Sequence, residues 1–127
     1  MSEVLSKLLA PNEWQAVEQF VGQLHERYPE RIRQTTLFGS KARGDSREWS
    51  DIDILVIVDD EDWRFQHAIS DVASDLSLEY DVLIGPRVIG EERWARMEQD
   101  ESSLYRNIAA EGIPLSLGTI PEGERVS

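Results

Sequence analysis

Asp51 and Asp53 stand one residue apart at the start of an apolar run, in the sequence DIDILVIV at residues 51–58. Side chains two residues apart on a β-strand point to the same face, so the two carboxylates should lie together. Like charges at short range oppose ionisation unless a cation lies between them. Mg²⁺ prefers oxygen ligands and is usually held by one or two carboxylates plus substrate phosphates. The pair therefore favours a hard divalent cation, although two solvated acids or a turn cap would give the same pattern.

Gly39 and Ser40 close the segment that precedes the aspartates, and they favour a ligand site over a solvated pair. A glycine lets a phosphate come close to the backbone, and a serine offers an amide and a hydroxyl to phosphate oxygens. A helix beginning there would add exposed amides that attract an anion. Lys41 and Arg43 supply positive charge nearby. A Gly-Ser turn alone is an ordinary loop, but beside Asp-x-Asp it predicts a triphosphate site in which these four residues bind the nucleotide.

The combination resembles the DNA polymerase β-like nucleotidyltransferase superfamily, whose signature is Gly-Ser, a short spacer and Asp-x-Asp before a hydrophobic strand. Here the spacer runs from Lys41 to Ser50 and is ten residues long. The segments FGSKARG at 38–44 and SDIDILV at 50–56 look like those of the minimal nucleotidyltransferases, which are often paired with a HEPN-domain partner in prokaryotic toxin–antitoxin modules. The resemblance covers roughly residues 14–115.

This resemblance implies a polymerase β palm-like mixed sheet and two Mg²⁺ ions, with Mn²⁺ as an alternative. It also implies ATP as the substrate and a third carboxylate from a later strand, which would make Asp51, Asp53 and Asp81 both the catalytic and the metal-binding residues. Asp81 lies in the sequence EYDVLI, and Glu79 is the reserve candidate because it would share a strand face with Asp81. The group moved would be AMP and the acceptor a hydroxyl, such as a tyrosine, on a HEPN toxin, so the chain would act as an antitoxin.

Two other functions stay open on the sequence alone. The chain could silence its toxin by covering it, with a vestigial nucleotide site, or it could modify a small hydroxyl compound of the aminoglycoside kind. Intact Gly-Ser and carboxylate residues argue against the first, and the lack of room for a second domain argues against the other. Apolar residues near the C-terminus either form the face for the partner or close the core: Trp94, Met97, Leu104, Tyr105 and Ile108.

The elements that position these residues follow from hydrophobic spacing. Apolar residues three and four apart predict helices, and β-branched runs predict strands. The expected order is a helix at 12–28, strands at 31–38 and 51–58, a helix capped by Asp62, a strand at 79–84, and helices at 90–98 and 102–111. The run after Asp53 is typical of a central strand covered on both faces. The order predicts an α+β fold whose helices pack mainly on one face of the sheet.

Length, charge and composition limit the remaining choices. We expect one domain over the 127 residues, with a core at about 12–117 and a flexible tail at 118–127. The net charge is −12 and its whole excess lies in residues 51–127, which disfavours a polynucleotide substrate. The chain has no cysteine, so any metal must be held mainly by oxygen. Without an apolar run long enough for a bilayer or a secretion signal, we expect a cytoplasmic protein.

Overall fold

The computed structural model describes residues 3–45 and 50–115, and the predicted tail at 118–127 lies outside them. In chain order the elements are α1 (Glu3–Leu8), α2 (Pro11–Arg27), β1 (Ile32–Phe38), α3 (Gly39–Arg43), β2 (Ile52–Val58), α4 (Trp63–Tyr80), β3 (Ile84–Gly90), α5 (Glu91–Gln99), α6 (Ser103–Glu111) and β4 (Ile113–Leu115). The predicted order of the longer elements is confirmed. The short α1 and β4 were not predicted.

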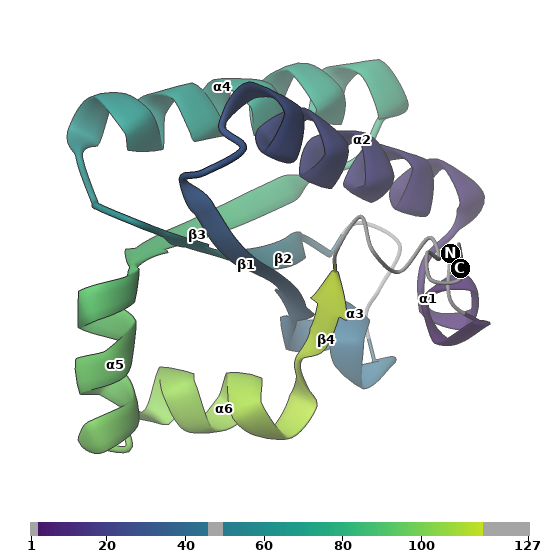
Figure 1. Ribbon diagram of the computed structural model, residues 1–127. Helices are drawn as coiled ribbons and strands as arrows, with labels where there is room; N and C mark the ends of the chain where they lie inside the picture. Colours follow the sequence, from purple (N-terminus) through teal and green to yellow (C-terminus); the bar gives the residue numbers. More distant parts are fainter. Residues whose placement is uncertain (1–2, 46–49, 116–127) are drawn as a thin grey trace, which may run out of the picture.

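The strands form one mixed sheet in the order β3-β2-β1-β4 (Figure 1). Neighbouring β1 and β2 are antiparallel, β4 is antiparallel to β1, and β3 is parallel to β2 because α4 connects them. The central β2 is buried along almost its entire length, as its continuous apolar sequence predicts. The α+β class and the mixed sheet are confirmed.

Helices cover both faces of this sheet (Figure 1). The two long helices, α2 and α4, lie on one face and supply most of the larger apolar cluster, whose fully buried members include Phe20, Leu24 and Ile69. On the other face, α5 and α6 cover a smaller cluster around Leu55 and Ile89. Most of the helical length therefore packs on one face, as predicted. The apolar residues Trp94, Met97, Leu104 and Ile108 pack in this second cluster.

The structure contradicts the predicted strand at 79–84. Helix α4 continues to Tyr80, and Asp81 ends it in the left-handed conformation with a φ of 57°. The strand starts only at Ile84 and runs through Pro86 to Gly90. A proline fits there because β3 is an edge strand, where a missing amide breaks no ladder on the open side. Asp81 and Glu79 therefore do not share a strand face.

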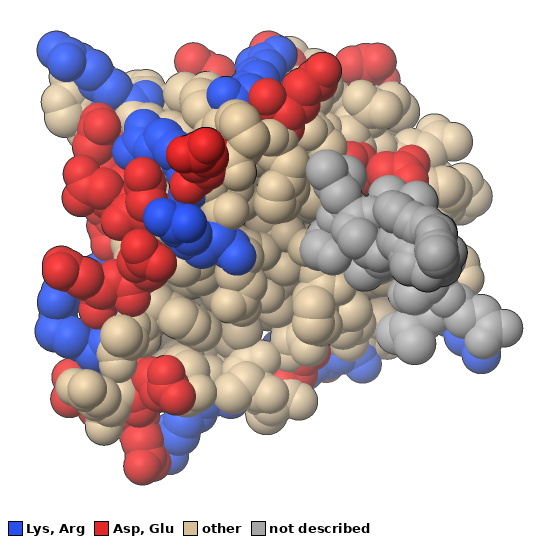
Figure 2. All heavy atoms as spheres, viewed as in Figure 1, with Lys and Arg blue, Asp and Glu red and all other residues tan. Residues whose placement is uncertain are grey.

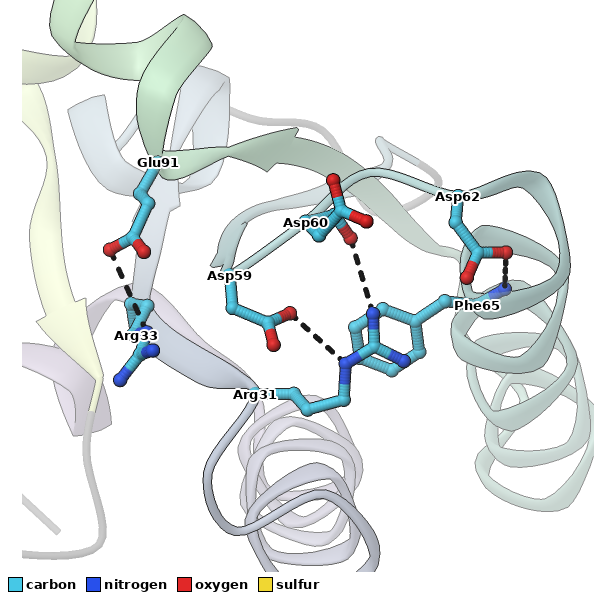
Figure 3. A network of polar contacts seen from close by, with 7 residues as sticks. All are labelled: Arg31, Arg33, Asp59, Asp60, Asp62, Phe65 and Glu91. Atoms are coloured by element: carbon cyan, nitrogen blue, oxygen red, sulfur yellow. Dashed lines mark hydrogen bonds and ion pairs between the residues drawn. The ribbon is translucent and has the colours of Figure 1, made fainter.

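The end of the sheet where β1 begins and β2 ends is held by a polar network (Figure 3). Arg31 donates from Nε to Asp59 Oδ1 at 3.0 Å, and its guanidinium lies 3.8 Å from the ring centre of Phe65. Asp62 accepts hydrogen bonds from the first backbone amides of α4, which confirms it as the cap of that helix. The acidic run at 59–62 thus serves the fold at the end of β2 opposite the Asp51–Asp53 pair.

Acidic side chains gather on the side of the molecule where α5 and the turn before α4 lie (Figure 2). Basic side chains stand between them, and the pairs Arg33–Glu91 and Arg93–Glu61 span 3.6 Å and 3.2 Å. These exposed pairs contribute little stability individually. Within the described residues, none of the helices is both long and apolar enough to cross a lipid bilayer.

Candidate active site

The turn between β1 and α3 comes close to the carboxylate of Asp53. In the sheet register Phe38 pairs with Asp53, so the next residue, Gly39, lies beside that aspartate. A Cβ built on Gly39 would stand 2.2 Å from Asp53 Oδ2, and the glycine has a φ of +78°. The short distance leaves no room for a Cβ, and the positive φ would strain any residue that has one. The Gly-Ser turn and the Asp-x-Asp motif are thus in direct contact.

The carboxylates of the two predicted metal ligands, Asp51 and Asp53, both lie close to a second glycine, Gly85. Gly85 of β3 pairs with Asp53, and a Cβ built on it would lie 3.7 Å from Asp53 Oδ1 and 3.9 Å from Asp51 Oδ2. Both carboxylates therefore reach the same point of β3, where no side chain stands. The predicted strand at 79–84 ends before Gly85, so this glycine is not among the predicted site residues. Its signal in the sequence was a glycine inside an apolar segment, which often marks a place where another group approaches the backbone.

The electrostatics of this pair favour a cation. Partial burial raises the pKa of Asp53, the charge of Asp51 raises it further, and the positive charge of Arg43 opposes both effects. A carboxylate whose ionised form is disfavoured in the metal-free protein gains from a divalent cation bound between the two acids. The oxygen donors of the two carboxylates fit such an ion. Among the described residues, however, no group of three or more acids and histidines is arranged to hold a metal.

Ser40 lies in the short helix α3, which begins at Gly39, so a helix does begin at this turn. The Ser40 carbonyl accepts hydrogen bonds from the amide of Gly44 at 3.0 Å and from the amide of Asp45 at 3.2 Å, and these bonds end the helix. Gly44 is left-handed, with a φ of +81°, and a Cβ there would lie 3.3 Å from Leu8 of α1. The serine is therefore carried on a compact turn that is closed on both sides by glycines.

Lys41 does not point toward the nucleotide site, which corrects the sequence prediction. Its side chain is only 4% exposed, and its Nζ lies 2.6 Å from Oε2 of Glu13 in the first turn of α2. A buried ammonium requires such a partner, because desolvating an unpaired charge is costly. The charge of Lys41 thus serves the packing of α3 against α2 and is not presented to a phosphate.

Arg43 lies at the rim of the site and carries the positive charge that opposes the raised pKa of Asp53. Its Nε donates to Asp45 at 3.1 Å and its Nη1 to Glu111 of α6 at 3.3 Å. These two acids also raise the pKa of the Arg43 guanidinium. Because the side chain is 43% exposed, it can exchange these carboxylates for a phosphate without a large desolvation cost.

Asp81 and Glu79 are both exposed at the C-terminal end of α4. The segment that follows approaches the aspartate pair, since the Ile52 amide donates to the Leu83 carbonyl at 2.7 Å. Asp81 itself stands three residues before Ile84, the β3 residue that pairs with Ile52. The structure thus brings Asp51, Asp53 and Gly39 together and leaves Asp81 outside that group.

Comparison with known proteins gives three findings of one kind. A family model described as nucleotidyltransferase domain matches residues 17–113. A Methanocaldococcus jannaschii protein named "Putative protein adenylyltransferase MJ0604" is 41% identical over 101 residues, which are 80% of this chain and 95% of that protein. The solved "Structure of putative minimal nucleotidyltransferase" is 25% identical, with a TM-score of 0.52 over 80% of this chain and 92% of the other.

A further solved structure, "Crystal structure of the toxin-antitoxin with AMP-PNP", shares the fold alone. It is 20% identical, with a TM-score of 0.52 over 81% of this chain and 76% of the other.

Proposed function

The chain belongs to the nucleotidyltransferase domain family and is a nucleotidyltransferase, and we propose that it moves AMP from ATP onto a hydroxyl group of a protein partner. The observation that carries this proposal is the contact between the Gly39 turn and the Asp51–Asp53 pair. A phosphate-binding turn and a cation-binding pair must adjoin if one triphosphate is to touch both. The relative named as a protein adenylyltransferase supports the choice of AMP and of a protein acceptor.

Enzymes of this family use a nucleoside triphosphate and a divalent metal. Asp51 and Asp53 would hold Mg²⁺, which supplies charge neutralisation for the departing pyrophosphate. In the transfer itself, the acceptor oxygen forms a bond to the α-phosphorus while the bond to the β-phosphate oxygen breaks. The acceptor proton passes to a carboxylate of the site. The protein mainly orients the reactants, which alone can supply much of the rate.

Ser40 would bind the triphosphate through its amide and hydroxyl, with Gly39 allowing close approach and Arg43 adding charge. We expect Ser40→Ala to weaken the binding of ATP by about tenfold, because one phosphate hydrogen bond to a charged group is lost. The thermal midpoint should change little. Isothermal titration with AMP-PNP and Mg²⁺, beside a melting curve, measures both effects. An unchanged affinity would remove the Ser40 hydroxyl from the site.

Asp81 is our proposed third carboxylate because it matches the family motif. It lies outside the group formed by Asp51, Asp53 and Gly39, but it stands two residues before Leu83, whose carbonyl accepts a hydrogen bond from the Ile52 amide at the start of β2. We expect Asp81→Asn to lower the transfer rate by about a hundredfold, within the usual range for a lost acid–base group, and to leave the binding of ATP nearly unchanged. Glu79→Gln, two residues away in the same helix end, is the matched control. Loss of transfer in Glu79→Gln alone would assign the role to Glu79.

The partner we propose is a HEPN-domain toxin, which this chain would neutralise as an antitoxin. Support comes from the resemblance of residues 38–44 and 50–56 to the minimal nucleotidyltransferases that are paired with such toxins. A toxin–antitoxin structure with AMP-PNP has the same fold. ATP labelled at the α-phosphate tests the chemistry directly: label should pass to the acceptor protein, whereas ATP labelled at the γ-phosphate should leave it unlabelled. Transfer of the γ-label would indicate a kinase instead.

A further inference from the structure

A buried ion pair stands directly behind the nucleotide turn, and the proposed reaction uses neither of its members. Glu13 and Lys41 are 28 residues apart in sequence, and their side chains are 11% and 4% exposed. Charged residues are rarely buried this deeply, and a buried pair is often no more stabilising than apolar residues of similar size. Stability alone therefore explains the pair poorly.

Glu13 uses its two carboxylate oxygens on two different elements. Its Oε1 accepts a hydrogen bond from the Ala10 amide at 2.8 Å, which fixes the carboxylate to the start of α2. Its Oε2 contacts Lys41 Nζ at 2.6 Å. The neighbouring Asn12 donates to the Tyr80 carbonyl at 2.9 Å, which ties the same end of α2 to the end of α4. Glu13 is thus a fixed anchor at the active-site end of the long helices.

Lys41 transmits the position of this anchor to the nucleotide turn. It follows Ser40 directly in α3, a helix of only five residues that has little stability of its own. On the other side of the turn, Gly39 lies against the Asp53 carboxylate without room for a Cβ. A small displacement of α3 would therefore change the spacing between the serine and the aspartate pair.

We propose that Glu13 is a positioning residue for nucleotide binding, which holds the Gly39–Ser40 turn at its working distance from Asp53 through the buried ammonium of Lys41. This inference rests on the proposed function, since it requires that the turn binds a triphosphate. Misplacement of a binding group by about 1 Å is enough to cost up to a hundredfold in rate. The pair thus acts on the nucleotide without touching it.

The test is the double variant E13L/K41M, which removes both charges and leaves neither buried without a partner, so that it should fold. We expect the dissociation constant of AMP-PNP with Mg²⁺ to rise about tenfold or more, with the Michaelis constant for ATP rising in parallel and a smaller change in kcat. E13Q keeps the side-chain shape but removes the charge that faces the buried Lys41 ammonium, so its thermal midpoint should fall. Measured below that midpoint, its affinity should change in the same direction as that of E13L/K41M.

The matched control is R31M/D59L, which removes an ion pair at the opposite end of the sheet (Figure 3). It should leave the affinity for AMP-PNP within about twofold of the parent even where its thermal midpoint falls. Parent-like affinity in E13L/K41M and E13Q, or an equal loss in the control, would overturn the positioning role. Failure of the parent itself to bind AMP-PNP would overturn the proposed function and this inference with it.

Discussion

Asp53→Asn is expected to lower nucleotidyl transfer by at least about a thousandfold, because it removes a proposed ligand of the cation. Neutralising the charge that develops on the phosphates contributes several kcal/mol to such reactions, and about 4 kcal/mol corresponds to three orders of magnitude in rate. The amide keeps the size of the carboxylate but carries no charge to offer the metal. The rate is measured as pyrophosphate release with ATP, Mg²⁺ and the acceptor.

The same substitution should not harm the metal-free fold. Burial and Asp51 raise the pKa of Asp53, so its ionised form is a destabilising feature of the folded state. That penalty is present above the raised pKa and disappears as the pH falls through it and the carboxylate takes up a proton. In EDTA at neutral pH, Asp53→Asn should therefore melt at or above the temperature of the parent, and this advantage should shrink on acidification.

Asp59→Asn, at the far end of the same strand, is the control for this variant. It removes an acid that holds Arg31 and has no part in the site, so transfer should continue at the parent rate. Normal transfer by Asp53→Asn would contradict the metal role of the pair, and a large fall in its metal-free melting temperature would contradict the electrostatic account.

Gly39→Ala should give the second large fall in transfer rate, because the new methyl group would overlap the Asp53 carboxylate. The Cβ would lie 2.2 Å from Asp53 Oδ2, and a φ of +78° is strained for any residue with a side chain. Strain of this kind costs about 1–3 kcal/mol, and Asp53 must turn away from its position to relieve the contact. We expect transfer to fall by about a hundredfold or more, from a displaced carboxylate and a blocked phosphate approach.

Gly22→Ala is the matched control for Gly39→Ala. Gly22 lies within α2, and a Cβ there would meet nothing within 4 Å. The change should stabilise the protein by up to about 1 kcal/mol, since alanine favours a helix over glycine, and should leave transfer unchanged. Chemical denaturation and steady-state rates measure both variants. A fully active Gly39→Ala protein would mean that the turn does not work in the conformation described here.

Most of the fold follows from local patterns in the sequence. The continuous apolar run after Asp53 predicts the buried central strand, and the spacing around Phe65 with Asp62 before it predicts α4 and its cap. The predicted strand at 79–84 was wrong because the pattern of a short apolar segment is the same at a helix end and in a strand. There, α4 continues through Leu76 and Tyr80, both packed on the core. The sequence of residues 79–84 alone does not predict that packing.

Some residues of the candidate site could likewise be predicted from neighbouring sequence, whereas others depend on contacts between distant segments. Asp51, Asp53 and Gly39 could be grouped because the two strands that carry them are joined by a short connection. Lys41 was assigned to the nucleotide on its charge, whereas its burial depends on Glu13, 28 residues earlier in the chain. Gly85 reaches the site only through the parallel pairing of β3 with β2. The positions of Lys41 and Gly85 thus depend on contacts between segments that are distant in the sequence.

The proposed transfer of AMP to a protein hydroxyl, with Asp51 and Asp53 as catalytic residues, is tested most directly by intact-mass spectrometry. This chain and the protein encoded beside it are measured after incubation with ATP and Mg²⁺. We predict that the partner gains the mass of one or more AMP groups with the parent enzyme and none with Asp53→Asn. An unmodified partner in a stable complex, or the same gain with Asp53→Asn, would contradict the claim.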